Sequence, residues 1–380
     1  MDICKEVQDQ YSYMVHMRRS LHMAPELSCE EQKTARLVES ELIAAGIPCE
    51  RLENNGVVGH LYGKQPGPVL ALRADMDALP IQEMTDAPYA SKTPGVMHAC
   101  GHDGHTAALL GAARVLAGHR DVLRGEVRLI FQPAEEVCLG SKGMIAAGAM
   151  EGVDSVFGMH VDLKSPVGTF SFQPGVITCA ADRFSLRFQA EASDPPMALQ
   201  AAGATVLALQ TLCSRETDPK KIFVLSCCTM NGNSSEVTIE GTCRYSDTEV
   251  YHTIGDNLKR VTENTARAFH VQGTAVLEHM AYPVVNHAGY CAKARQSAQK
   301  LFGSGCLYES GTNSVSEDFA EYLRLADGMF AQLGANRPDM SLSYPNHNAR
   351  FDFDEKALYY GAALFVQYTM DLLAEPCSQQ

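Results

Sequence analysis

Several features are missing from this sequence, and each absence excludes a class of protein. None of the 13 cysteines belongs to a Cys-x-x-Cys pair, and they are scattered along a chain of 380 residues. Such usage argues against a disulfide framework and favours reduced thiols in the cytoplasm. Basic residues are also few, with 31 lysines and arginines against 45 aspartates and glutamates and a formal net charge of −14. Because nucleic-acid binding depends on clustered basic side chains that neutralise phosphates, we expect no nucleic-acid partner.

Long apolar segments are missing as well. No stretch approaches the roughly 18 uninterrupted apolar residues of a membrane helix. The opening MDICKEVQDQYSYM has neither the basic end nor the apolar run of a secretory signal. We therefore expect a cytoplasmic protein with no membrane partner. The chain does contain 46% hydrophobic and 20% charged residues, which is ordinary for a folded protein. Its length exceeds the roughly 250 residues that one core supports, which predicts two domains.

In the first 181 residues, short apolar strands alternate with helical stretches, which predicts an α/β sheet with helices on its faces. Ligands of such sheets gather at the carboxyl ends of the strands. Side chains able to bind metal follow three of the predicted strands, and two more precede a buried helix. We therefore expect one crevice to collect them. They are Asp75 and Asp77 after strand 69–73, Glu135 and Glu136 after strand 127–131, His160 near the end of strand 155–161, and Cys100 and His102 before helix 107–117.

A different order of elements begins at about Asp182. The pattern there is strand, helix, strand, strand, helix, strand, which is the ferredoxin-like βαββαβ arrangement. We expect this segment, 182–282, to be a separate domain inserted into a discontinuous one formed by residues 1–181 and 283–380. A long closing helix within 351–373 would pack back on the first domain, and SVSEDFAEYLRL is expected to be helical.

The Cys-x-His triplet at Cys100 and His102 offers a thiolate and an imidazole from one turn of loop, both of which are ligands of borderline divalent ions. Alone the triplet is weak evidence, because a buried cysteine also behaves as a small hydrophobe. Its combination with carboxylates and a histidine at strand ends favours a metal site. The neighbouring His98 and His105 could add ligands, or could serve loop, capping or packing roles, and stay unassigned.

Two interpretations fit the Glu135–Glu136 pair. The carboxylates are either merely solvated after a strand, or they divide two tasks. Successive side chains of an extended backbone point in opposite directions. One carboxylate could therefore bind metal while the other moves a proton from water to a leaving nitrogen.

Six ordered motifs together resemble the metal-dependent N-acyl-amino-acid amidohydrolases, the branch of the aminoacylase and carboxypeptidase family that includes hippurate hydrolases and indole-acetyl-amino-acid hydrolases. The resemblance spans nearly the whole chain. It implies a metallopeptidase-like catalytic domain with two divalent metal ions (Zn, Mn, Co or Ni) and an inserted lid domain that commonly mediates dimerisation. The motifs are RADMDALPI, MHACGHDGHTA, FQPAEE, GMH, SEDF and NHNARFDFDE.

The resemblance also implies roles for individual residues. Glu135 would be the general base and acid. Asp75 and Asp77 stand where related peptidases keep a metal-binding histidine and its supporting aspartate, and here they would orient the ligands. Apart from the resemblance, a substrate carboxylate needs a cation or amide donors, and Arg244 at the end of a strand of the inserted domain is a candidate partner, although an arginine on a strand is more often solvated. The implied metal ligands are Cys100, His102, Glu136, His160 and His347.

Two segments depart from the family pattern. The segment RFQAEASDPPMALQAAG lacks the family's glycine-rich GGHxAxPH sequence, whose histidine helps to hold the developing oxyanion. The segment TMNGNSSEVTIEGT lacks a longer loop that contains Asn-Val-Ile-Pro. Either the protein lacks these lid elements or the sequence omits residues at both places. The intact flanking motifs favour the second explanation, which an intact mass of 41.3 kDa would contradict.

The resemblance thus implies hydrolysis of the amide bond of N-acyl-amino acids, giving a carboxylic acid and a free amino acid. Three alternatives remain open. The first is a dipeptidase or carboxypeptidase of the same family, because a dipeptide is also an acylated amino acid. The second is a thiol hydrolase with Cys100 as its nucleophile. The third is a non-catalytic metal-binding relative with a truncated lid.

Overall fold

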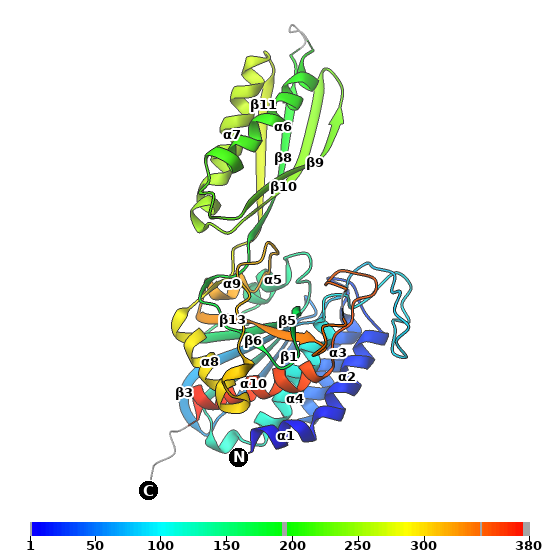
Figure 1. Ribbon diagram of the computed structural model, residues 1–380, viewed down its shortest axis with the longest axis vertical. Coiled ribbons are helices and arrows are strands. Elements are labelled where there is room, and N and C mark those ends of the chain that lie inside the picture. Colours follow the sequence, from blue (N-terminus) through cyan, green and yellow to red (C-terminus); the bar gives the residue numbers. More distant parts are fainter. Residues whose placement is uncertain (1, 192–195, 343, 375–380) are drawn as a thin grey trace. The chain divides into compact units, whose positions relative to one another are not determined.

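The computed structural model describes residues 2–191, 196–342 and 344–374, which form two compact units (Figure 1). The first unit comprises residues 1–175, 286–310 and 321–380, and the second comprises residues 176–285 and 311–320. The short strands β7 (Gly175–Val176) and β12 (Val285–Asn286) lie where the chain leaves and re-enters the first unit. No helix in the described ranges is long and apolar enough to span a bilayer.

A seven-stranded mixed sheet forms the middle of the first unit. Its four inner strands β4, β3, β5 and β13 are parallel, while β2 runs antiparallel to β1 and β4, and β6 runs antiparallel to β13. Parallel neighbouring strands place their carboxyl ends at the same edge of the sheet. Ligand sites of α/β sheets lie at this edge. The strands in spatial order are β1 (Cys49–Arg51), β2 (Val57–Tyr62), β4 (Arg124–Gln132), β3 (Gln65–Asp75), β5 (Ser155–Pro166), β13 (Asp327–Asn336) and β6 (Phe170–Ser171).

Helices cover this sheet. α4 packs against α2, α10 and β3, and α10 also contacts α8, β3 and β13 (Figure 1). Nearly every side chain of α4 is buried, and burying a leucine such as Leu109 contributes about 1.5–3 kcal/mol. The helices that lie wholly within the described part of the unit are α1 (Ile3–Asp9), α2 (Tyr11–Met23), α3 (Gln32–Ala44), α4 (His102–Ala117), α5 (Gly140–Ala146), α8 (Ala288–Phe302) and α10 (Lys356–Leu373), with 3-10 turns at Arg120–Val122 and Ser304–Cys306.

The second unit has the order β8, α6, β9, β10, α7, β11 and an antiparallel sheet with strand order β11-β8-β10-β9. Helices α6 and α7 pack together over the sheet. The α/β fold with a ferredoxin-like βαββαβ unit is therefore confirmed. The elements are β8 (Ala180–Gln189), α6 (Ala198–Arg215), β9 (Phe223–Gly232), β10 (Glu236–Tyr245), α7 (Thr248–Ala268) and β11 (Gln272–Ala281).

The two segments that depart from the family pattern both fall in this unit. Residues 192–195 of the first segment lie outside the described residues. The second segment is a tight hairpin between β9 and β10, closed by a hydrogen bond from the Asn233 amide to the Glu236 carbonyl at 2.8 Å.

Two helix predictions are corrected. The SVSEDFAEYLRL segment contains only the four-residue α9 (Ala320–Leu323), and the Glu317 side chain accepts from the Phe319 amide instead of capping a longer helix. The closing helix begins at Lys356, and residues 351–355, which were expected to belong to it, are not helical, although Phe351 and Phe353 among them are buried in the core.

Candidate metal centre and active site

The loop that carries Cys100 and His102 ends at the first turn of α4. Gly101 between them has φ +98°, a left-handed conformation that side chains other than glycine rarely adopt. A Cβ atom at this position would also lie only 2.5 Å from Cγ2 of Val161 on β5. Glycine thus lets the loop approach the middle of β5, which continues to Pro166 and so runs past the predicted strand 155–161, and burial of α4 fixes the direction of the loop.

His102 is fully buried and held from one side. Its Nδ1 lies 2.9 Å from the backbone oxygen of Asp77 and 3.2 Å from the Oδ1 of that residue. Its Nε2 has no hydrogen-bond partner among the described residues and lies 3.8 Å from Oε1 of Glu136. Burial opposes protonation of His102, but the charges of Asp75 and Cys100 outweigh it and raise the pKa well above its usual range. The surroundings therefore hold negative charge that either a proton or a metal ion can balance.

Cys100 and His160 meet across the same space. The Cys100 Sγ lies 3.3 Å from Nε2 of His160, and the His160 Nδ1 lies 2.8 Å from the Val161 carbonyl. A carbonyl only accepts, so Nδ1 carries the hydrogen and Nε2 is left with a lone pair. The Asn346 side chain donates to the Cys100 backbone oxygen at 3.2 Å and approaches its sulfur at 3.5 Å.

Glu135 and Glu136 lie in a turn after β4. The backbone amides of this turn donate hydrogen bonds to two other carboxylates. Ala134, with φ +54°, donates its amide to the buried Glu31 at 2.8 Å, and the Glu136 amide donates to Asp77 at 3.0 Å. Glu135 is buried, and the Oε1 atom of Glu136 is a buried acceptor without a hydrogen-bond partner among the described residues. Sequence reasoning missed Glu31, because its contact with Ala134 joins positions 103 residues apart.

His347 reaches the same place from the loop before α10. Its amide donates to the Ala99 carbonyl at 2.8 Å, and its Nε2 lies 3.3 Å from Oε2 of Glu136. Hydrogen bonds with Cys100 and Glu136 raise the pKa of His347 to about 10. The half-exposed ring thus faces two of the predicted ligands.

The five predicted metal ligands are brought together. Their donor atoms fall in overlapping groups whose members all lie within 4.8 Å of one another. Thiolate, imidazole and carboxylate donors of this kind suit borderline divalent ions. One imidazole nitrogen and one carboxylate oxygen, both buried and both without a hydrogen-bond partner in the described part of the chain, also lie 3.8 Å apart there. The residues therefore fit a metal site. The groups are Cys100–His102–His160, Cys100–Glu136–His347 and His102–Glu135–Glu136, with Asp75–His102–His105 beside them.

The two predicted supporting aspartates differ in their contacts. Asp77 holds the His102 imidazole and the Glu136 amide, and hydrogen bonds lower its pKa although burial opposes this. Asp75 lies 3.7 Å from the His102 Nε2, and its hydrogen bonds go to Arg73 at 2.7 Å and to His105 at 2.6 Å.

Arg244 lies on β10 in the second unit. Its guanidinium donates to the Ser316 hydroxyl at 2.8 Å within that unit. Its predicted contact with a substrate carboxylate stays a prediction.

Residues 71–371 match the family model described as Peptidase family M20/M25/M40. The N-acetyl-L-cysteine deacetylase of Bacillus subtilis is 36% identical over 91% of this chain and 84% of its own length. Thermostable carboxypeptidase 2 of Saccharolobus solfataricus is 36% identical over 94% of each chain. The crystal structure of the YXEP protein of Bacillus subtilis, a dinuclear metal binding peptidase, superposes with a TM-score of 0.85 at 32% identity, covering 95% of this chain and 98% of that one. This chain therefore belongs to Peptidase family M20/M25/M40, a family of metal-dependent hydrolases.

Proposed function

We propose that the protein hydrolyses the amide bond of N-acyl-amino acids and releases a carboxylic acid and a free amino acid. One observation carries the proposal: thiolate, imidazole and carboxylate donors from the start of α4, the turn after β4, the middle of β5 and the loop before α10 converge beside the buried carboxylate of Glu135. The similarity to a deacetylase of an N-acylated amino acid supports the substrate class.

We assign two divalent ions, Zn, Mn, Co or Ni, to this centre. Divalent ions at such a site polarise a substrate carbonyl and lower the pKa of water. The overlapping donor groups support two ions, since Cys100 belongs to two of them. The proposed ligands are Cys100, His102, Glu136, His160 and His347.

Glu135 is the proposed proton-transfer residue. Its neighbour Glu136 turns toward His102 and His347, and the buried carboxylate of Glu135 lies in one group with the donor atoms of His102 and Glu136. Glu135 would take a proton from the attacking water and later give it to the departing amine, so one carboxylate serves both halves of the reaction. Asp77 would keep the His102 ring oriented throughout, since it fixes Nδ1 and directs Nε2 inward.

The remaining assignments concern the second unit and the setting of the enzyme. We assign residues 1–181 and 283–380 to catalysis and residues 182–282 to a lid that joins two subunits in a homodimer. Arg244 would bind the carboxylate of the amino-acid product through its guanidinium. The proposed compartment is the cytoplasm.

A peptidase activity is the second candidate, because a thermostable carboxypeptidase is as similar to this chain as the deacetylase is. Both reactions cleave an amide next to an amino acid that bears a free carboxylate. They differ in whether the acyl part carries an amino group. Substrates that differ only in this group therefore separate the two activities.

The test is release of free amino acid from matched N-acetyl-amino acids, N-benzoyl-amino acids and dipeptides, with metal-loaded and chelator-treated protein. We expect hydrolysis of the acylated substrates that stops with chelator and returns with added divalent metal. Preferred cleavage of dipeptides would instead indicate a peptidase. Activity that survives chelation but is lost after alkylation of Cys100 would indicate a thiol hydrolase. Metal binding without hydrolysis of any substrate would indicate a non-catalytic relative.

A further inference from the structure

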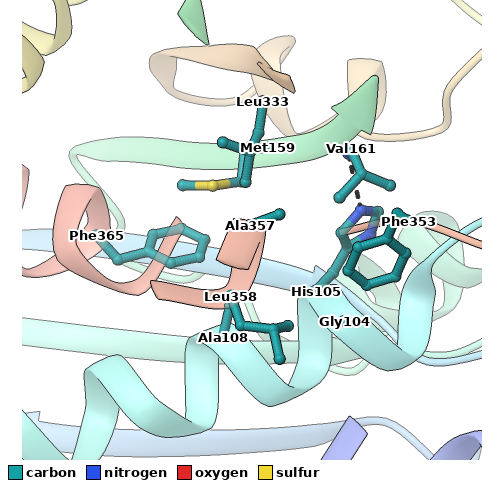
Figure 2. A pocket seen from close by; sticks show the side chains of 10 residues that line it. All are labelled: Gly104, His105, Ala108, Met159, Val161, Leu333, Phe353, Ala357, Leu358 and Phe365. Carbon is teal, nitrogen blue, oxygen red and sulfur yellow. Dashed lines mark hydrogen bonds between the residues drawn. The ribbon is translucent and has the colours of Figure 1, made fainter. Parts of the chain in front are cut away.

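His105 lies one turn after His102 on α4 and is almost completely buried. Figure 2 shows its ring in the wall of a pocket whose other lining residues are apolar or glycine. Polar groups in such surroundings are costly unless they are hydrogen-bonded. Both ring nitrogens have partners: Nδ1 lies 2.6 Å from Oδ1 of Asp75, and Nε2 lies 3.0 Å from the amide nitrogen of Val161.

These partners fix the position of the hydrogen on the ring. The Val161 amide can only donate, so Nε2 of His105 is the acceptor and Nδ1 carries the hydrogen. That hydrogen is directed at the Asp75 carboxylate, whose other oxygen accepts from Arg73 at 2.7 Å. The result is a continuous chain of hydrogen bonds from Arg73 on β3 to the Val161 amide on β5.

The Val161 amide needs this partner because the neighbouring strand has already stopped pairing. The ladder between β3 and β5 runs from Leu70–Ser155 to Arg73–Gly158. Val161 lies three residues beyond it, and its amide donates to the His105 imidazole instead of to β3. The His105 side chain thus supplies the hydrogen-bond acceptor that β3 no longer provides at this position of β5.

The carbonyl of the same residue acts on the metal centre. It lies 2.8 Å from Nδ1 of His160, and this bond turns the His160 Nε2 toward Cys100. Any movement of the Val161 residue therefore moves the His160 ring. The His105 imidazole accepts a hydrogen bond from the Val161 amide, and the His160 imidazole donates one to the Val161 carbonyl.

We propose that His105 is a positioning residue for the metal centre: by accepting from the Val161 amide it fixes the middle of β5, and through the Val161 carbonyl it fixes the His160 imidazole that faces Cys100. The inference rests on the proposed function only in that His160 is taken as a metal ligand. It predicts that the acceptor at Nε2, rather than the donor at Nδ1, is what the metal centre requires.

Two amide variants separate these atoms. His105→Gln places a carbonyl oxygen near the position of Nε2 and can accept from Val161. His105→Asn is shorter and retains only a donor for Asp75. Both replace a buried ring by a smaller neutral amide, so each is the control for the lost packing. His119→Gln, in which a histidine 2.6 Å from Glu6 at the opposite end of α4 is replaced, controls for loss of an unrelated ring.

The measurement is Co²⁺ affinity by competition with a chelator, together with the visible spectrum of the Co²⁺ protein, which reports ligand geometry. We expect His105→Asn to weaken binding by about 10–100-fold, as loss of a group that orients a ligand does, and to change the spectrum. We expect His105→Gln and His119→Gln to stay close to wild type in both. Equal weakening in the Gln and Asn variants, or unchanged binding in the Asn variant, would overturn the inference.

Thermal unfolding of the same samples accompanies the binding assay. Equal unfolding temperatures of the Gln and Asn variants with unequal Co²⁺ affinity would support positioning, while affinities that merely follow the unfolding temperatures would overturn it. Hydrolysis is not part of either readout. A wild-type protein that binds Co²⁺ but cleaves no acyl-amino acid would therefore contradict the proposed function and leave the role of His105 to be decided by the two variants.

Discussion

His22 gives the protein a stability that depends on pH. Its imidazole is buried between two carboxylates, with Nδ1 2.8 Å from Asp103 and Nε2 3.3 Å from Glu83. Burial and the nearby Arg18 disfavour the protonated ring, and the ring of His98 lies 6.2 Å away. The two carboxylate hydrogen bonds prevail and raise the pKa of His22 to about 9.

The sign and size of the effect follow from this shift. The folded state holds the proton more tightly than the unfolded state, whose pKa is the ordinary 6.5. The stabilisation is therefore fully present below pH 6.5 and is lost as the pH rises through about 9. A rise from 6.5 to about 9 corresponds to roughly 3 kcal/mol of unfolding free energy.

His22→Gln removes the titrating group and keeps an amide that can hydrogen-bond to a carboxylate. The assay is urea denaturation of metal-free protein between pH 6 and pH 10, followed by circular dichroism because the chain has no tryptophan. Metal-free protein avoids proton release coupled to metal binding. We expect the wild-type advantage over the variant to shrink by roughly 3 kcal/mol between pH 6.5 and pH 9. An advantage that is constant over this range would refute the reasoning.

Three further substitutions test other contacts. Arg18→Met removes the fully buried guanidinium that lies 3.3 Å from Asp103. His22 still contacts Asp103, but this buried carboxylate loses its permanently charged partner, which should lower the unfolding free energy by about 3 kcal/mol in urea denaturation; a loss below about 1 kcal/mol would contradict this. Burial raises the pKa of Glu31 to about 7, so the folded state disfavours its charge and the wild-type protein should lose stability as the pH rises from 4.5 to about 7. Glu31→Gln should remove this loss in urea denaturation, and an unchanged pH profile of the variant would argue against it. Gly101→Ala should lower both stability, by about 1–3 kcal/mol, and Co²⁺ affinity, since φ is +98° and the new methyl group meets Val161; wild-type affinity would show that the loop tolerates a side chain.

Local patterns predicted the part of the fold that carries the chemistry. The apolar runs of β3, β4 and β5 are short, are bounded by proline or charge, and end at the residues that meet in the metal centre. Since parallel strands share a carboxyl edge, their order along the chain was enough to predict this convergence. The βαββαβ unit could be predicted equally well, because the hydrophobic residues of its strands and of its amphipathic helices recur with different periods.

Contacts between segments far apart in the chain could not be predicted from the sequence pattern. His347 lies in an irregular loop and came only from the family resemblance, because no periodicity places a loop residue. His105 stayed unassigned between a ligand and a loop, capping or packing role, because the contact that decides its role depends on where β3 stops pairing with β5. The short strands β1 and β2 are not among the strands predicted from the sequence, since tertiary pairing rather than local propensity forms them.

The most direct test of the account compares amino-acid release by wild type and Glu135→Gln at equal measured metal content. Glutamine has nearly the same shape as glutamate but cannot take a proton from water. We predict unchanged metal binding, because Glu135 is not a proposed ligand, and a fall in the rate of hydrolysis of at least about 10²-fold. Hydrolysis by the variant at close to the wild-type rate, with both proteins fully loaded, would contradict the central claim that Glu135 moves the proton in a metal-dependent amidohydrolase.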